Sequence, residues 1–393
     1  MNWPVGVINE VNEVKRLNWK RYLLLFLFLC VLLGVSICGV NYLYSGYFDN
    51  LSSAVIFLYG VLVIVFLILL SFKAYIYSVQ LTVYEACKAE SEKIKQQWIH
   101  WASKRACING YRFFSPEVID IQSVINNSAF DVHTSQLLSL HQGESGRYKE
   151  IEIYIELLSS VRAVIKEIDD RLSFRIIFIN SANPLSFSFF KSAWLECGFR
   201  EEKIVSHDFY SSGLWDSFIE TIDDGINDKI TIVLSVNLSD VAVSSNNSTE
   251  FASLNIFSVF NSPKAQSVVY RPMFCTRGDL KQGLLLLVTY QPDICLASAI
   301  NFCGVSEQDI ALITSELKKA ANSLSREWVF SIKDLGMTFG VQDDKHAWLS
   351  LCYLSDVCKA SNRSQLMVSK NSDGFLFSLI APQSPVDVVG DLL

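Results

Sequence analysis

Two long stretches near the start of the chain lack any charged side chain. They cover residues 22–40 and 54–72, and Asp49 is the only charged residue in the connection between them. A helix of about 20 apolar residues crosses the hydrocarbon core of a bilayer, about 30 Å thick, with its backbone groups satisfied. The absence of charge therefore predicts a transmembrane helical hairpin over residues 22–72, in contact with the lipid bilayer.

The connection between these runs also lacks basic residues. Lys and Arg lie instead on the two flanks, at Lys15, Arg16, Lys20 and Arg21 before the first run and at Lys73, Lys88, Lys93 and Lys95 after the second. Basic residues favour the cytoplasmic side of a membrane. The pattern predicts a two-span inner-membrane protein with both termini in the cytoplasm.

The sequence contains none of the common metal or cofactor motifs. Its ten cysteines include no Cys-x-x-Cys pair, and its five histidines form no His-Glu-x-x-His pair. Neither the phosphate loop Gly-x-x-x-x-Gly-Lys-Ser/Thr nor the dinucleotide motif Gly-x-Gly-x-x-Gly occurs. We therefore expect no metal site and no cofactor, and we expect the cysteines to be free thiols in a reducing compartment.

A basic surface is missing from the large remainder of the chain. The formal charge of the whole chain is −7. Residues 1–21 carry +2 and residues 22–72 carry −1, which leaves −8 for residues 73–393. Binding to nucleic acid depends on Lys and Arg contacts with phosphates. The acidic balance therefore predicts no nucleic-acid partner.

The pattern of the sequence predicts five segments. Residues 1–21 are a cytoplasmic N-terminal segment, 22–72 the hairpin, and 73–108 a helical stalk with apolar residues at helical spacing. Residues 109–146 are rich in Ser, Asn, Gln, Gly and His and read as a polar linker or lid. Helix and strand patterns alternate over residues 147–393, which predicts an α/β domain.

Within the α/β domain, two signals are specific. Residues 229–238, KITIVLSVNL, have the continuous apolar pattern of a buried strand. Ser306 precedes an amphipathic stretch and predicts the N-cap of a helix over 307–322. The remaining predictions are helices over 149–168, 215–223 and 346–360, and strands over 174–179, 251–260, 267–270, 284–289, 329–332, 365–369 and 375–380.

Polar residues near the predicted strand ends form a candidate pocket. Its members are Asn180, Asn183, Ser235, Asn237 and His346, with Asp343 and Asp344 close to the histidine. Sheets of α/β domains place their sites at strand ends. Loop capping explains the same residues more simply, and Cys197 and Cys303 have no flanking base that would activate a thiol, so no catalytic residue is predicted.

Between Asp309 and Cys358 a helix, DIALITSELKKAANSL, leads into a strand, WVFSI, then a Lys-Asp-Leu-Gly loop and an apolar helix, HAWLSLCYLSDVC. The order of elements from about residue 170 onward, and this stretch especially, resembles the thiolase or ketoacyl-synthase superfamily. In the synthases this loop carries a Gly-His pair whose histidine contacts the substrate carbonyl. The matching pair here is Gly336-Met337. The resemblance implies a thiolase-like layered α/β domain that is a catalytically inactive pseudoenzyme.

Membrane-tethered proteins of this build also resemble bacterial type VI secretion accessory proteins, including the lipase-adaptor group. That resemblance implies a non-catalytic adaptor that holds a cytoplasmic protein partner, an effector or a secretion component, at the inner membrane. Two alternatives stay open. One is an acyl-binding or acyl-transfer enzyme of thiolase-like fold, and the other is an immunity protein against a toxin. The sequence does not decide the oligomeric state.

Overall fold

The computed structural model describes residues 3–4, 13–16, 18–43, 51–116, 136–140, 150–168, 172–179, 184–210, 222, 229–238, 248–258, 265–371 and 374–383. The chain divides into two units. One comprises residues 7–97, and the other, called the body below, combines residues 1–6 with residues 98–393. Each unit is described by itself.

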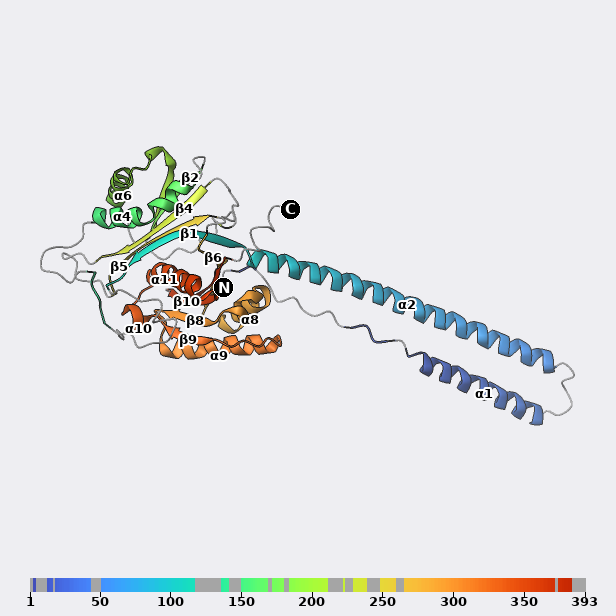
Figure 1. Ribbon diagram of the computed structural model, residues 1–393. Helices are drawn as coiled ribbons and strands as arrows, with labels where there is room; N and C mark the ends of the chain where they lie inside the picture. The colour runs from blue at the N-terminus through green and yellow to red at the C-terminus, as the bar shows by residue number, and fades with distance from the viewer. Residues whose placement is uncertain are drawn as a thin grey trace. The chain divides into compact units, whose positions relative to one another are not determined.

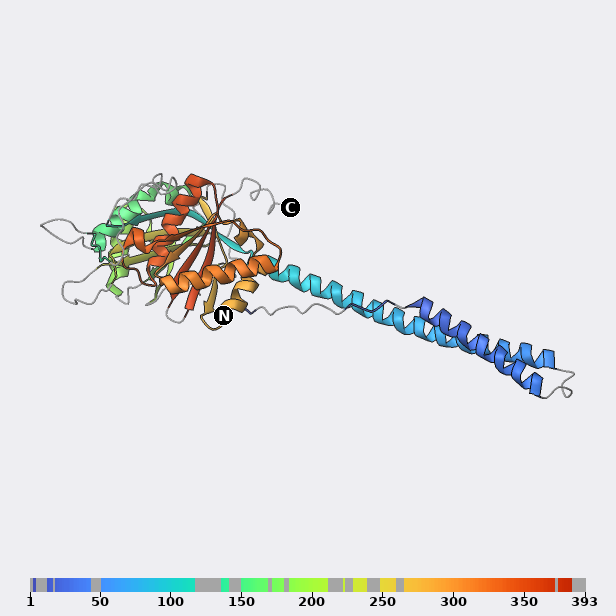
Figure 2. The same cartoon turned by 90° about the horizontal axis from the view of Figure 1, so that it is seen from below.

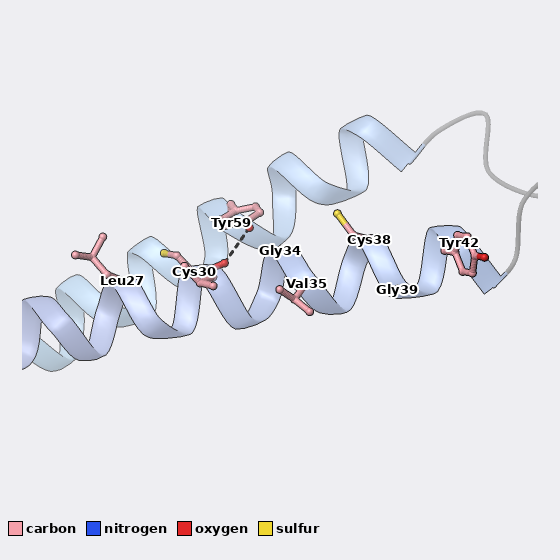
Figure 3. A pocket seen from close by; sticks show the side chains of 9 residues that line it. Leu27, Cys30, Gly34, Val35, Cys38, Gly39, Tyr42 and Tyr59 are labelled. Carbon is pink, nitrogen blue, oxygen red and sulfur yellow. Dashed lines mark hydrogen bonds between the residues drawn. The ribbon is translucent and has the colours of Figure 1, made fainter.

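The first unit contains two long apolar helices, α1 (Trp19–Leu43) and α2 (Leu51–Ala102), of which the last residues of α2 belong to the body. Both are long and apolar enough to span a membrane. The Tyr59 hydroxyl of α2 donates to the Cys30 carbonyl of α1 at 3.0 Å, beside Gly34 (Figure 3). A Cβ at Gly34 would lie 2.9 Å from the Tyr59 oxygen, so glycine permits this approach. The two predicted apolar helices are confirmed.

The described strands of the body form one 11-stranded mixed sheet. Its order is β3-β2-β4-β5-β1-β6-β11-β10-β8-β9, with β7 paired to β11. The bounds are β1 Arg105–Phe114, β2 Ser173–Ile179, β3 Ile204–Tyr210, β4 Lys229–Asn237, β5 Phe251–Ser258, β6 Ser267–Tyr270, β7 Met273–Thr276, β8 Ala299–Cys303, β9 Ser331–Asp334, β10 Gln365–Asn371 and β11 Gly374–Pro382.

Two groups of strands repeat the same arrangement. In the first, β2 pairs in parallel with β3 and β4, and β4 pairs antiparallel with β5. In the second, β8 pairs in parallel with β9 and β10, and β10 pairs antiparallel with β11. Strands β1 and β6 join the two groups. The body is therefore built from two similar halves.

Helices separate and cover the halves of the sheet (Figure 1). Helices α4 (Glu150–Ser160) and α6 (Pro184–Glu196) cover the first half, and α8 (Leu280–Tyr290) and α9 (Glu307–Ser323) cover the second. Figure 2 shows α9 lying over the strands of its half. Helix α11 (His346–Ser361) lies between the halves. Short helical turns complete the body: α5 (Arg162–Glu167), α10 (Gly336–Phe339), η1 (Glu201–Lys203) and η2 (Pro292–Leu296).

The central position of α11 follows from its sequence. Its side chains are buried around nearly the whole circumference, including those of Trp348, Leu351 and Tyr353. A helix that is apolar on all sides needs cover on all sides. Residues of α11 pack with β1, β5, β10 and β11 in one core cluster, and two further clusters lie under α4 and α6 and under α8 and α9.

Several predicted boundaries differ from the structure. Helix α2 ends at Ala102 rather than at residue 108, and residues 109–114, assigned to the polar linker or lid, belong to strand β1. Residues 284–289 lie in helix α8 rather than in a strand, because a short leucine run carries no periodicity that separates the two. The rest of the linker, apart from residues 136–140, and nearly all of the helix predicted over 215–223 lie outside the described residues.

Candidate functional site

A histidine and an aspartate meet at the N-terminus of the central helix. His346 is the first residue of α11, and Asp343 lies in the preceding loop. The His346 side chain is fully buried because α11 is covered on all sides. Its Nδ1 lies 2.7 Å from the Asp343 Oδ1.

The short contact fixes the protonation of the imidazole. A carboxylate only accepts hydrogen bonds, so the proton lies on Nδ1 and Nε2 carries a lone pair. The backbone nitrogen of Asp343 also lies 3.1 Å from Nδ1, but Nδ1 cannot donate and accept at once. We place the proton on Nδ1 because the contact with the carboxylate is shorter and charge-assisted. His346 Nε2 is buried without a hydrogen-bond partner in the part of the chain that the structure describes. The arrangement is a buried base with an oriented ring.

The second oxygen of Asp343 connects the site to the other half of the body. The Ser248 hydroxyl donates to Asp343 Oδ2 at 2.9 Å. Asn237, at the carboxyl end of β4, donates to the Ser248 oxygen at 3.1 Å and to the Thr249 carbonyl at 2.8 Å. The chain Asn237, Ser248, Asp343, His346 therefore joins residues from both halves.

The electrostatics keep Asp343 ionised. Burial would raise the pKa of its carboxyl group, but the hydrogen bonds from His346 and Ser248 and the positive charge of Lys345 outweigh burial and lower the pKa overall. An ionised Asp343 orients the ring and stabilises an imidazolium if Nε2 takes up a proton.

A buried thiol, that of Cys303, lies close enough to Asp343 to feel its charge. Cys303 ends β8 and is fully buried, and burial raises its pKa to about 12. The next residue, Gly304, has a φ of +65°, and its N–H donates to Gln342 Oε1 at 2.9 Å. A buried thiol of raised pKa is not an activated nucleophile.

Comparison with known proteins finds no matching family model and no matching curated protein. Solved structures do match. One is a type II polyketide ketosynthase, bound to a hexaketide and in complex with its acyl-carrier protein, at a TM-score of 0.52 and 12% identity, covering 71% of this chain and 99% of that one. Another is the oxazolomycin ketosynthase domain KS8 of OzmH from Streptomyces albus, at a TM-score of 0.50 and 8% identity, covering 72% and 96%. The fold is thiolase-like.

The thiolase-like fold confirms the predicted fold class and corrects the prediction about activity. The sequence predicted a non-catalytic pseudoenzyme because Gly336-Met337 replaces a Gly-His pair. That prediction is wrong, since the structural neighbours are ketosynthases and point to an enzyme. Met337 lies in the short helix α10, 41% exposed, and the buried imidazole is instead that of His346, at the start of the next helix.

The predicted pocket is brought together in part. Asn237 and His346 join one hydrogen-bonded chain, as described above. Ser235 lies two residues before Asn237 on β4, fully buried, and its hydroxyl finds no partner among the described residues. Asn180 and Asn183 lie outside the described residues. No group of three or more potential metal ligands occurs in the described part of the chain.

Sequence reasoning missed Ser248. It placed Asp343 close to His346 but did not predict that the two side chains pair. Ser248 sits in a polar stretch, where nothing in the sequence separates it from its neighbours. The pairing has a weak signal, because an Asp three residues before a His at a helix start places both groups within reach. The sequence signal points to a site only once the structure shows that α11 lies between the two halves of the body.

Proposed function

We propose that this chain is a membrane-anchored acyl-transfer enzyme that acts on thioesters. One observation carries the proposal: His346 is fully buried, its Nδ1 is held by Asp343, and its Nε2 is left without a partner among the described residues. A buried polar atom without a partner costs free energy, so its retention needs an explanation. A reacting group that binds at Nε2 supplies one.

The chemistry follows from the state of the imidazole. Nε2 takes the proton of the attacking group and returns it to the departing thiolate, which is general acid–base catalysis worth about 10²–10⁴-fold in rate. Asp343 stabilises the imidazolium between the two transfers. The N-terminus of α11 carries the positive end of the helix dipole, which favours negative charge developing on the thioester oxygen.

The apolar hairpin supplies the anchor in this proposal. Residues 22–72 hold the protein in the inner membrane, with the catalytic body in the cytoplasm, as the basic flanks of the two helices predict. The predicted cytoplasmic protein partner then becomes a carrier that delivers the thioester, in keeping with the ketosynthase neighbour in complex with its acyl-carrier protein. Nothing in the comparisons favours type VI secretion, an adaptor or an immunity protein.

The test is turnover of an acyl thioester by the full-length protein in lipid nanodiscs. With 1-octanol present as an acyl acceptor, loss of palmitoyl-coenzyme A is followed by chromatography and mass spectrometry for the wild type, His346→Ala and, as a matched control, His100→Ala, which replaces an exposed histidine outside the site. We expect His346→Ala to lose about 10²–10⁴-fold in rate and His100→Ala to keep the wild-type rate. Equal rates for wild type and His346→Ala, or no turnover by the wild type, would overturn the proposal.

A further inference from the structure

The buried thiols of the body are poorly placed to carry an acyl group. All ten cysteines are described, and none of them forms a disulfide bond. Cys30, Cys38 and Cys87 lie in the unit of the two apolar helices, and the other seven lie in the body. A cysteine that attacks a thioester must reach the substrate as a thiolate. In the body, only Cys295 is not buried, and it packs against the cluster under α8 and α9 rather than the cluster around α11. Burial raises its pKa, although the neighbouring Arg326 acts in the opposite direction.

Cys303, whose thiol is close enough to Asp343 to feel its charge, is held in its neutral form. Cys303 is fully buried and feels the carboxylates of Asp343 and Asp334, which oppose a second negative charge beside them. Burial is the main cause of the raised pKa of Cys303, and the hydrogen bonds with Ser350 and Ser369, which lower the pKa, offset it only in part. Its surroundings are the reverse of those that activate a cysteine, which are electropositive and partly exposed.

Four other buried thiols use their protons in hydrogen bonds. Cys197 donates to the Ile155 carbonyl, Cys275 to the Thr276 carbonyl, Cys352 to Asn255 Oδ1 and Cys358 to the Ile380 carbonyl. A thiolate would place its negative charge against these oxygen atoms. Burial raises the pKa of each of the four thiols.

The Ser248 hydroxyl of the site is also not placed to act as a nucleophile. Ser248 donates its proton to Asp343 and not to His346, so the three residues are not a serine nucleophile with its base. In such a triad the serine donates to the histidine. The described residues thus contain a base, His346, without a nucleophile beside it.

From this combination we infer that the acyl group passes directly from the thioester to a hydroxyl-bearing acceptor, without a cysteine-bound intermediate. The acceptor oxygen forms a bond to the thioester carbon, and its proton moves to His346 Nε2. The carbon–sulfur bond breaks, and the departing thiolate takes that proton, so that an ester and a free thiol leave. A hydroxyl needs such a base, whereas a neutral amine attacks thioesters unaided. The inference rests on the proposed function.

The experiment uses the full-length protein in nanodiscs with palmitoyl-coenzyme A as donor and 1-octanol as acceptor. We expect octyl palmitate and free coenzyme A, no acylated protein by intact mass after acid quenching, and turnover by Cys303→Ser within about twofold of the wild type, because a neutral buried thiol takes no part. His346→Ala is expected to lose about 10²–10⁴-fold in the rate of ester formation.

The outcomes separate the two proposals. Turnover that depends on His346 but accumulates an acylated cysteine or serine, located by peptide mass spectrometry, would overturn direct transfer and leave the proposed function standing. Loss of turnover in a folded Cys303→Ser variant would do the same, with Cys303→Ala as a second variant. Turnover that yields only palmitate, at every octanol concentration, would overturn the hydroxyl acceptor. No turnover by the wild type would overturn both proposals.

Discussion

At the scale of single residues, the site depends on one carboxylate with two partners. Asp343 accepts a hydrogen bond from His346 at 2.7 Å and another from Ser248 at 2.9 Å. The first contact sets which ring nitrogen carries the proton, and the second sets the position of the carboxylate. The two contacts therefore have different consequences when they are removed.

Replacing Asp343 should therefore harm the reaction more than replacing Ser248. Asp343→Asn removes the negative charge that holds the Nδ1 proton, and we expect kcat to fall by about 10²–10⁴-fold with little change in KM. Ser248→Ala removes one hydrogen bond worth about 1.5–3 kcal/mol to a charged group and should lower kcat by about tenfold or somewhat more. Ser159→Ala, an exposed serine of α4, is the control. Equal losses for Asp343→Asn and Ser248→Ala would contradict the argument.

A second carboxyl group, Asp356 of α11, makes a prediction about pH. Burial raises its pKa, and the Tyr111 hydroxyl donates to it at 2.6 Å. A raised pKa means that the ionised form destabilises the folded state, so the carboxyl costs stability above its folded pKa and less below it. Asp356→Asn keeps an acceptor for Tyr111 without the charge. We expect a melting temperature a few degrees above wild type at pH 7 and a smaller gain at pH 4.5. A gain that grows on acidification would contradict this assignment.

At the scale of helices and strands, local signals decide what the sequence predicts. Ser306 was predicted as an N-cap, and the structure places its oxygen 3.3 Å from the Asp309 N–H, at the start of α9. Ser306 also donates to Asp309 Oδ2 at 2.8 Å. We expect Ser306→Ala to lower the free energy of unfolding by about 1 kcal/mol, measured by urea denaturation. Ser323→Ala, at the other end of the helix, should have a smaller effect.

Elements whose pattern matches their surroundings were predicted well. The central helix was predicted over 346–360 and spans His346–Ser361, and the buried strand predicted over 229–238 is β4. Strand β1 was missed, because its ten residues contain Arg105, Gly110 and Arg112 and pair with β5 and β6, which are distant in sequence. The site could not be predicted in full for the same reason, because Ser248 and Asp343 are distant in sequence and meet only after the two halves pack.

At the scale of the whole chain, one contact bears on how the hairpin crosses the membrane. Trp3 precedes helix α1, and Trp101 lies in the last turn of α2, after the apolar run over residues 54–72. Within the body, the rings of Trp3 and Trp101 meet edge to face, with centroids 5.5 Å apart. The Trp3 Nε1 donates to the Pro272 carbonyl at 3.0 Å, and the Arg271 guanidinium lies 4.0 Å from the centre of the Trp101 ring. Both flanks of the predicted hairpin therefore belong to one folded body.

If the two apolar helices cross a membrane as we propose, this contact requires an even number of crossings, and positions on the two flanks should lie on the same side. In spheroplasts of a Cys38→Ser background, a membrane-impermeant maleimide should leave native Cys87 and an added Lys15→Cys unlabelled until the membrane is permeabilised. Ser53→Cys, between the two apolar runs, should label at once because the basic flanks face inward. Opposite labelling of Lys15→Cys and Cys87 would mean a single crossing, which the packing of Trp3 against Trp101 does not permit. Labelling of both flanks from outside, with Ser53→Cys protected, would keep the hairpin and reverse its orientation.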